Sequence, residues 1–288
     1  MLRIGRFAGT WLLAGALGAG AALAATETVL HNFAPPPKGA NPESGVIGDS
    51  AGNLYGTTYS GGAHNMGVVY QIDSSGRETV LYNFTGGADG GQPTGSLIRD
   101  SSKNLYGTTY LGGTGNVGVV YMVSAAGQET VLYTFTGGAD GKYPSGGVIR
   151  DSAGNLYGTA GSGGAGNAGV VYRIDTAGHE TVLHSFTGVD GMSPQGVIRD
   201  SAGNLFGTTS IGGKRKAGVA YKLDTSGNLK LLYQFTDRAD GGYPAAGVVR
   251  DSLGNIYGTT AGGGTGKVGV VYMVDTGGNE TVLHAFNW

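Results

Sequence analysis

One unit of about 50 residues recurs five times in this chain, a period typical of solenoid and propeller architectures. The unit is found by aligning the motif Asn-Leu/Ile-Tyr/Phe-Gly-Thr, whose aromatic residue stands at Tyr55, Tyr106, Tyr157, Phe206 and Tyr257. A second aromatic follows 15 residues later in every copy, at Tyr70, Tyr121, Tyr172, Tyr221 and Tyr272. A third follows 14 residues after that, at Phe84, Phe135, Phe186, Phe235 and Phe286. The only change of length is a two-residue deletion between the third and fourth copies, so the constant spacing predicts a repeated structural unit.

Each unit reads as four short strands, here called A to D. In the second copy we expect them at Ser96 to Arg99, Asn104 to Tyr110, Val119 to Val123 and Glu129 to Phe135. All four are rich in β-branched and aromatic residues and are bounded by Gly, Asp, Asn or Ser. The A–B and C–D links are short and carry turn residues. The pattern therefore predicts an antiparallel meander.

Strands B, C and D carry apolar or aromatic residues on both faces, as at Leu105 and Tyr106 or Val119 and Val120. A sheet of this kind must lie between two others. Radial repetition of four-stranded units achieves this, so we predict an all-β fold, a β-propeller of five blades with four antiparallel strands each. A β-solenoid is the alternative, although its coils are usually shorter. We attribute a mid-strand glycine in every copy, such as Gly107, to the close approach of another backbone near the axis.

A sixth copy of strand D occupies Glu27 to Phe33, so five A–B–C sets meet six D strands. It either completes the blade that holds the last A, B and C strands or remains surplus. We favour a five-bladed ring with this extra N-terminal strand doubling an outer edge. An open arc that closes by pairing with another chain is the other arrangement.

The N-terminal region has the pattern of a secretory signal peptide. Arg3 and Arg6 precede an apolar run that is short for a membrane span, and Ala22-Leu23-Ala24 fits a cleavage site. We therefore expect an exported protein, in the periplasm, in the medium or at the cell surface, without membrane insertion of the mature chain. The predicted organisation is a signal peptide over 1–24 and a propeller over 25–288, with repeats at 45–84, 96–135, 147–186, 196–235 and 247–286 and the extra strand at 27–33.

Composition limits the function. The formal charge of −2 gives no electrostatic basis for nucleic-acid binding. The chain has no cysteine, so packing rather than disulfides must stabilise an exported domain. The 59 glycines lack the Gly-X-Y period of collagen and indicate dense turns.

The motifs Gly-Asn-Leu-Tyr-Gly-Thr-Thr, Gly-Val-Val-Tyr and Gly-x-Glu-Thr-Val-Leu-Tyr-x-Phe resemble those of the Gloeo/Verruco tandem repeat family of bacterial exported proteins. The resemblance extends over residues 26–288. It implies a propeller-like secreted or surface protein with no established activity. The strand layout is also similar to that of the NHL propellers.

In a meander the B–C and D–A connections share one end of the blade, and here these are the longer and more variable ones. Because binding residues favour variable loops on a rigid frame, we place a ligand site at this end. The candidates in the D–A loops are four aspartates and two tyrosines, Asp89, Asp140, Asp190, Asp240, Tyr143 and Tyr243. The aspartates have two interpretations, a ring of carboxylates for sugar hydroxyls or turn residues that bond to their own loop. The tyrosines are suited to stacking on sugar rings.

Copy four departs from the others. It has Phe206 for Tyr, Ala220 for Val and Leu229-Lys230-Leu231 for Glu-Thr-Val. Its B–C tip and the D–A loop after it add basic candidates, Lys214, Arg215, Lys216 and Arg238. Such a basic spot suits a carboxylated or sulfated glycan, and the other interpretation is a solvated tip.

No catalytic or metal site is predicted. The histidines at 31, 184 and 284 alternate with tyrosine in strand D, which indicates a structural aromatic position, and no His pair has metal-ligand spacing. There is no phosphate-binding loop and no acid–base pair, so no cofactor is expected. The leading hypothesis is a non-catalytic binding or scaffold propeller for glycan or protein. A lyase or hydrolase acting on extracellular polysaccharide and a purely structural surface protein are the alternatives.

Overall fold

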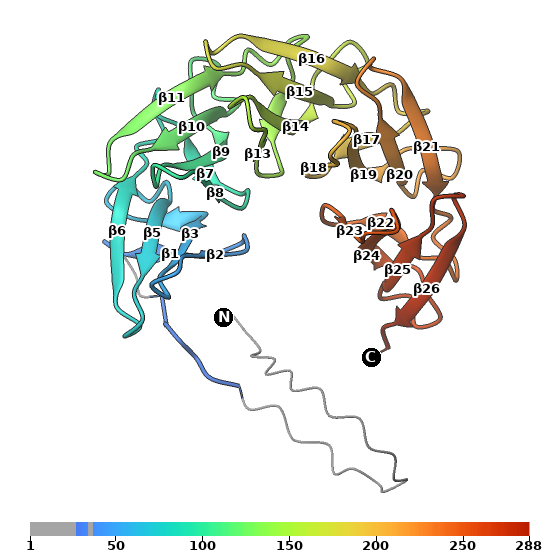
Figure 1. Ribbon diagram of the computed structural model, residues 1–288, viewed down its shortest axis with the longest axis horizontal. Coiled ribbons are helices and arrows are strands. Elements are labelled where there is room, and N and C mark those ends of the chain that lie inside the picture. Colours follow the sequence, from blue (N-terminus) through green and yellow to red (C-terminus); the bar gives the residue numbers. More distant parts are fainter. Residues whose placement is uncertain (1–26, 34–36, 288) are drawn as a thin grey trace, which may run out of the picture.

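The computed structural model describes residues 27–33 and 37–287, and these contain β-strands but no helix. Five sheets of four or five strands follow one another around an arc, each forming one blade, and a two-stranded sheet adjoins the first of them (Figure 1). The predicted fold class, an all-β propeller with five blades, is confirmed. The predicted signal peptide lies outside the described residues.

Blades 1 and 2 contain β1 (Gly39–Ala40), β2 (Ile47–Gly48), β3 (Leu54–Thr58), β4 (Ser60–Gly61), β5 (Val68–Ile72) and β6 (Glu78–Asn83), then β7 (Gly91–Pro93), β8 (Ile98–Arg99), β9 (Leu105–Leu111), β10 (Val119–Val123) and β11 (Glu129–Thr134). Blade 3 contains β12 (Lys142–Pro144), β13 (Ile149–Arg150), β14 (Leu156–Ser162), β15 (Val170–Ile174) and β16 (Glu180–Ser185). Blade 4 contains β17 (Met192–Pro194), β18 (Ile198–Arg199), β19 (Leu205–Ile211), β20 (Val219–Leu223) and β21 (Leu229–Gln234). Blade 5 contains β22 (Gly242–Pro244), β23 (Val249–Arg250), β24 (Ile256–Gly262), β25 (Val270–Val274) and β26 (Glu280–Ala285).

The innermost strand of each blade is split, which the sequence did not indicate. In blade 2 only Ile98 and Arg99 of the predicted strand A pair with β9, and a second piece, β7, pairs with the far end of β9. Pro93 belongs to β7 rather than to a loop, and it is tolerated there because an edge strand needs no donor on its open side. The other predicted strands are found within one or two residues of their expected bounds.

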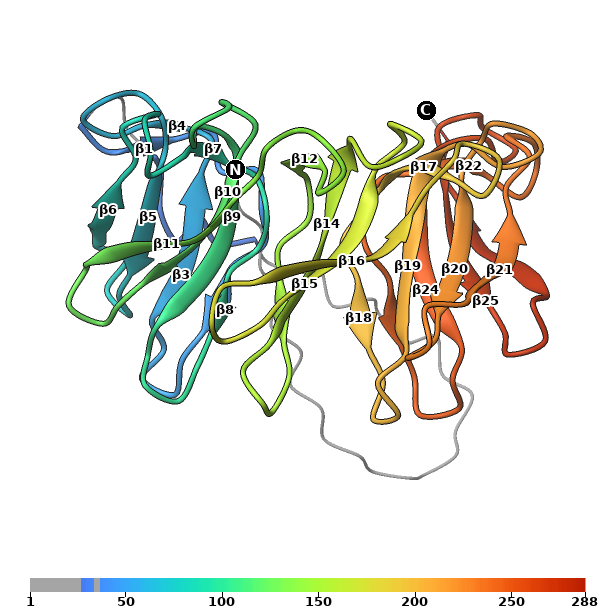
Figure 2. The ribbon, with the colours of Figure 1, turned by 90° about the horizontal axis from the view of Figure 1, so that it is seen from above.

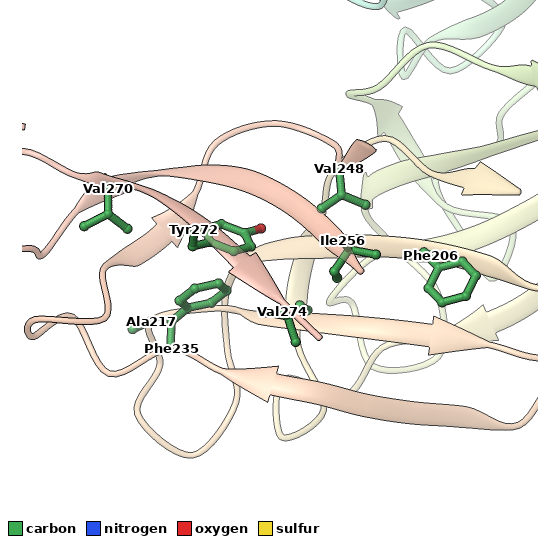
Figure 3. Close-up of a cluster of buried hydrophobic side chains, with 9 residues drawn as sticks. Phe206, Ala217, Phe235, Val248, Ile256, Val270, Tyr272 and Val274 are labelled. Atoms are coloured by element: carbon green, nitrogen blue, oxygen red, sulfur yellow. The ribbon is translucent and has the colours of Figure 1, made fainter. Parts of the chain in front are cut away.

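Both faces of the blades are buried, as the two-sided pattern predicted. Val119, Val120 and Tyr121 in β10 are all fully buried. The ring of Phe84 in blade 1 contacts Tyr121 in blade 2 edge-on, with centroids 4.9 Å apart. The same Phe–Tyr contact joins blades 2 to 3, 3 to 4 and 4 to 5. Figure 3 shows the last of these packed clusters, at the interface of blades 4 and 5.

The prediction that the mid-strand glycine allows another backbone to approach near the axis was wrong. A Cβ on Gly107 would lie 2.5 Å from the Tyr121 hydroxyl oxygen, so the glycine makes room for a tyrosine of the neighbouring strand in its own blade. Backbones do crowd elsewhere, on the wall that faces the axis. There a Cβ on Gly95 would lie 2.4 Å from the Gly147 nitrogen of the next blade.

The A–B turns are closed by one repeated aspartate. In blade 2 Asp100 accepts hydrogen bonds from the Asn104 backbone (2.9 Å), the Asn104 side chain (3.0 Å) and the Tyr106 hydroxyl (2.9 Å). Burial acts to raise the pKa of Asp100, but these hydrogen bonds outweigh it and the pKa lies below its ordinary value. The sequence Asp-x-x-x-Asn-Leu-Tyr therefore encodes a turn and its anchor together.

The arc is open between blades 1 and 5 (Figure 1), in contrast to the expected ring. Residues 27–33 form no strand but lie on blade 1, where Phe33 contacts Tyr70 (5.0 Å) as the Phe of a preceding blade would. The corresponding Phe286 of blade 5 is 42% exposed. The blade interfaces set the curvature, and five blades with this curvature leave both flanks uncovered by a further blade.

Candidate functional site

The B–C turns and D–A connections of successive blades lie on the same face of the arc, here called the rim face. Figure 2 shows β7, β12, β17 and β22 at this end. Each D–A connection is bound to the B–C turn of the following blade by a backbone hydrogen bond, such as Gly113 N–H to Gly87 O (2.8 Å). The rim is therefore a rigid frame on which side chains can differ from blade to blade.

In blades 1 to 3 an asparagine closes each B–C turn. Asn65, Asn116 and Asn167 have φ near 55° and accept a hydrogen bond from the first glycine of the turn through Oδ1. In blades 4 and 5 lysine replaces this asparagine, at Lys216 and Lys267, with φ of 58° and 59°. Lysine has no acceptor for that hydrogen bond and is less suited to positive φ, so these two turns should be less stable than those with asparagine. Both lysines are exposed cations.

The D–A connection into blade 5 departs from the repeat in a similar way. Asp237 and Arg238 occupy the positions of two glycines in the D–A connections that lead into blades 2 and 3. Asp237 retains the positive φ of the first glycine (57°). The Arg238 carbonyl accepts hydrogen bonds from Gly264 N–H (2.6 Å) and Gly241 N–H (3.2 Å). This fixes the backbone from which the guanidinium extends.

These departures surround a hollow of about 760 Å³ at the rim of blade 5, here called the rim hollow. Its lining includes Asp237, Arg238, Tyr243, Thr265 and Lys267. Ala261 and Gly262, small residues at the positions of Tyr110 and Leu111 in blade 2, also line it. With two cations and one carboxylate, the lining carries a net positive charge.

The two candidate tyrosines differ in what they can offer a ligand. The Tyr143 ring is stacked on Tyr110, with centroids 4.7 Å apart and planes inclined by 19°. The residue of blade 4 that corresponds to Tyr110 is Ser210, which offers no ring to stack on, and the Tyr243 ring is 40% exposed in the rim hollow. Its backbone N–H bonds to the Ala217 carbonyl (2.8 Å) in the B–C turn of blade 4, which fixes it between blades 4 and 5.

The four candidate aspartates are engaged within their own loops. Asp140 accepts hydrogen bonds from the Tyr133 hydroxyl (3.0 Å), Thr136 N–H (2.7 Å) and the Thr136 hydroxyl (2.6 Å). The same set of contacts holds Asp89 and Asp240, and Asp190 has His184 in place of the tyrosine. Burial acts to raise the pKa of Asp190, but the hydrogen bonds from Thr187 and His184 outweigh it and the pKa is lowered. This geometry is the one expected of aspartates that act as turn residues and bond to their own loop.

The three basic residues Lys214, Arg215 and Lys216 are exposed at the tip of the blade 4 B–C turn. They lie outside the lining of the rim hollow, but Lys216 directly precedes Ala217, to which Tyr243 is bonded. Of the sequence candidates, the hollow therefore brings together Arg238 and Tyr243. Asp237 and Lys267 were missed, although comparing Lys267 with Asn116 and Asn167 would have revealed the substitution.

No group of three His, Asp or Glu side chains in residues 27–33 and 37–287 is placed to hold a metal ion. In the same ranges no helix is long and apolar enough to cross a bilayer.

A profile of the Gloeobacter/Verrucomicrobia repeat matches residues 4–198 and 179–288. A search of curated proteins finds no significant match. Among solved structures, similar folds include a protein named as a candidate gluconolactonase, with 14% identity and a TM-score of 0.51 over 87% of this chain and 80% of that one. The extracellular domain of BT4673, a candidate one-component system from Bacteroides thetaiotaomicron, is 13% identical, with a TM-score of 0.55 over 85% of this chain and 30% of that one. At these identities the likeness concerns the fold alone.

Proposed function

This chain belongs to the Gloeobacter/Verrucomicrobia repeat family, and we propose that it is an exported, non-catalytic propeller that binds acidic glycans at the rim hollow. The observation that carries the proposal is the break in symmetry at blade 5. On a frame of five nearly equal units, one rim position combines an open tyrosine face with two cations and a hollow of about 760 Å³.

Each lining group has a role in this proposal. The Tyr243 ring offers an apolar face for a sugar ring, and Arg238 can receive a carboxylate or sulfate in two parallel hydrogen bonds. Lys267 adds a second charge from the facing turn. Asp237 can accept hydrogen bonds from sugar hydroxyls. The volume lies within the range of small-ligand sites, large enough for one or two sugar residues.

Binding of polygalacturonate, followed by calorimetry, tests the proposal, with dextran as the neutral control. The variant R238G/K267N restores the residues of blades 2 and 3 and should weaken binding about tenfold or more, because two charge-assisted contacts are lost. Y243A should weaken binding strongly. Y143A, the matched change in blade 3, should have little effect because that ring is already stacked on Tyr110.

Unchanged affinity in R238G/K267N would contradict the placement of the site. Analysis of the polysaccharide after incubation tests the other half of the proposal, since shortened or unsaturated products would show that the protein is an enzyme. Export has its own test, in which the N-terminal sequence of the mature protein should begin at Ala25.

A further inference from the structure

A second departure of blade 4 from the repeat lies at the opposite end of the strands from the rim hollow. Phe206, Lys222 and Lys230 stand side by side on β19, β20 and β21, because Phe206 pairs with Lys222 and Lys222 with Lys230. In the other blades the last two positions of this row hold Gln71 and Thr79, Met122 and Thr130, Arg173 and Thr181, or Met273 and Thr281. Blade 4 alone among the five places two lysines opposite each other.

Two like charges directly opposite on neighbouring strands destabilise a sheet. A third cation faces the same place from blade 5, because the Arg250 guanidinium carbon lies 5.1 Å from the centroid of the Phe206 ring. The Lys222 ammonium lies 5.8 Å from the same ring. The cation–π contacts account for part of the arrangement, but they do not relieve the repulsion between the lysines.

Asp200 attracts the Arg250 guanidinium and Asp224 the Lys222 ammonium, but neither carboxylate forms a close ion pair with these cations. In the other four blades a tyrosine hydroxyl donates to the turn aspartate, whereas Asp200, which faces Phe206, has hydrogen bonds from Asn204 and the Ala202 backbone but none from a hydroxyl at that position. Asp275 is bonded within its own turn, to Gly277 and Asn279. Within the described part of the chain, no ion pair within 4 Å joins Lys222, Lys230 or Arg250 to a carboxylate.

The three cations line a hollow of about 180 Å³ between blades 4 and 5, here called the interblade hollow. Its floor is the apolar cluster of Figure 3, where Phe206 lies close to Ile256 and Val274. Gly254 and Thr276, from turns of blade 5, complete the lining. The hollow is thus small, floored by apolar groups and positive on balance, with three cations against two carboxylates.

We infer that the interblade hollow binds a small oxyanion, the carboxylate, sulfate or phosphate group of a small ligand, through Lys222, Lys230 and Arg250. An oxyanion between the lysines replaces their repulsion with two attractive contacts, and Arg250 supplies a planar donor from the next blade. Because the ligand contacts both blades, its binding also stabilises their interface. This site is separate from the rim hollow and does not depend on the proposed function.

Thermal unfolding of the whole chain, followed as sulfate, phosphate or glucuronate replaces chloride at constant ionic strength, tests this inference. At least one anion should raise the unfolding temperature in a saturable way. The variant K222M/K230T, which installs the residues of blades 2 and 5, should raise the dissociation constant about tenfold or more. The variant should fold, because it removes a repulsion and uses a pair of side chains that blades 2 and 5 already accept.

Two further variants make the result specific. K267N, in the rim hollow, should leave the effect of the anion unchanged. F206Y keeps every charge but brings a hydroxyl toward Asp200 and into the hollow, so it should weaken binding through loss of space. The three anions distinguish an inorganic ligand from a sugar acid. The inference is overturned if no anion acts saturably, if K222M/K230T responds like the unchanged protein, or if K267N alone abolishes the effect.

Discussion

Two phenylalanines at equivalent positions should differ widely in their contribution to stability. Phe135 closes strand D of blade 2, is fully buried and contacts Tyr133 (5.2 Å) in its own blade and Tyr172 (5.1 Å) in the next. Phe286 closes strand D of blade 5 and is 42% exposed, and among residues 27–33 and 37–287 it contacts one ring, that of His284 (4.8 Å). The difference arises because no further blade covers blade 5.

The magnitudes follow from burial. Replacing a buried Phe with Ala costs about 3–5 kcal/mol, since the transfer free energy is lost and a cavity remains. For Phe286 the transfer free energy is roughly half of the 1.5–3 kcal/mol of a fully buried side chain, and an open site leaves no cavity. We therefore expect F135A to lose about 1.5–4 kcal/mol more than F286A in the free energy of unfolding.

Urea unfolding followed by tryptophan fluorescence and circular dichroism measures both losses under the same conditions. A large decrease of the midpoint for F135A and a clearly smaller one for F286A would support the open arc. Equal losses would refute the reasoning, because they would mean that the flank of blade 5 is covered in solution.

Three smaller predictions concern single repeats. Burial, together with the negative charge of Asp89, raises the pKa of Glu129 from 4.5 to about 7. The folded state therefore binds this proton more tightly than the unfolded state, so stability should fall as pH rises from about 4.5 to about 7. In thermal scans over this range, E129Q should reduce that fall. Y106F removes the hydroxyl that anchors Asp100 and should cost about 1 kcal/mol in urea unfolding, and an unchanged midpoint would contradict the anchoring role. Lys103 has φ of 70° where the other four A–B turns have glycine, so K103G should stabilise the protein by about 0.5–1 kcal/mol, whereas a loss would show that this turn does not strain lysine.

The repeat made much of the fold predictable from sequence. A fixed spacing of aromatic residues, turn aspartates at strand ends and apolar residues on both faces of strands such as β10 specify a blade that needs neighbours. These are local properties of one unit, repeated five times. They determine strand order and pairing without knowledge of the rest of the chain.

Features that depend on contacts between units were harder to predict. The split inner strand follows from Pro93 pairing at an edge, and the open arc follows from the angle that four packed interfaces impose. The role of Gly107 was misjudged because the group that covers it, Tyr121, comes from another strand of its own blade. At the rim, Arg238 and Tyr243 could be selected from the sequence as candidates. That Lys267 lines the same hollow could not, because it depends on the hydrogen bond between the D–A connection into blade 5 and the B–C turn of blade 5.

The five blades form a symmetric frame, and one rim position, that of blade 5, is chemically distinct. Hydrogen exchange of the whole chain, with and without an oligogalacturonate, tests whether ligand binds there. We predict protection of backbone amides in residues 237–243 and 263–267, with blades 1 to 3 unchanged. Equal protection at all five rims, or protection confined to blades 1 to 3, would contradict this prediction.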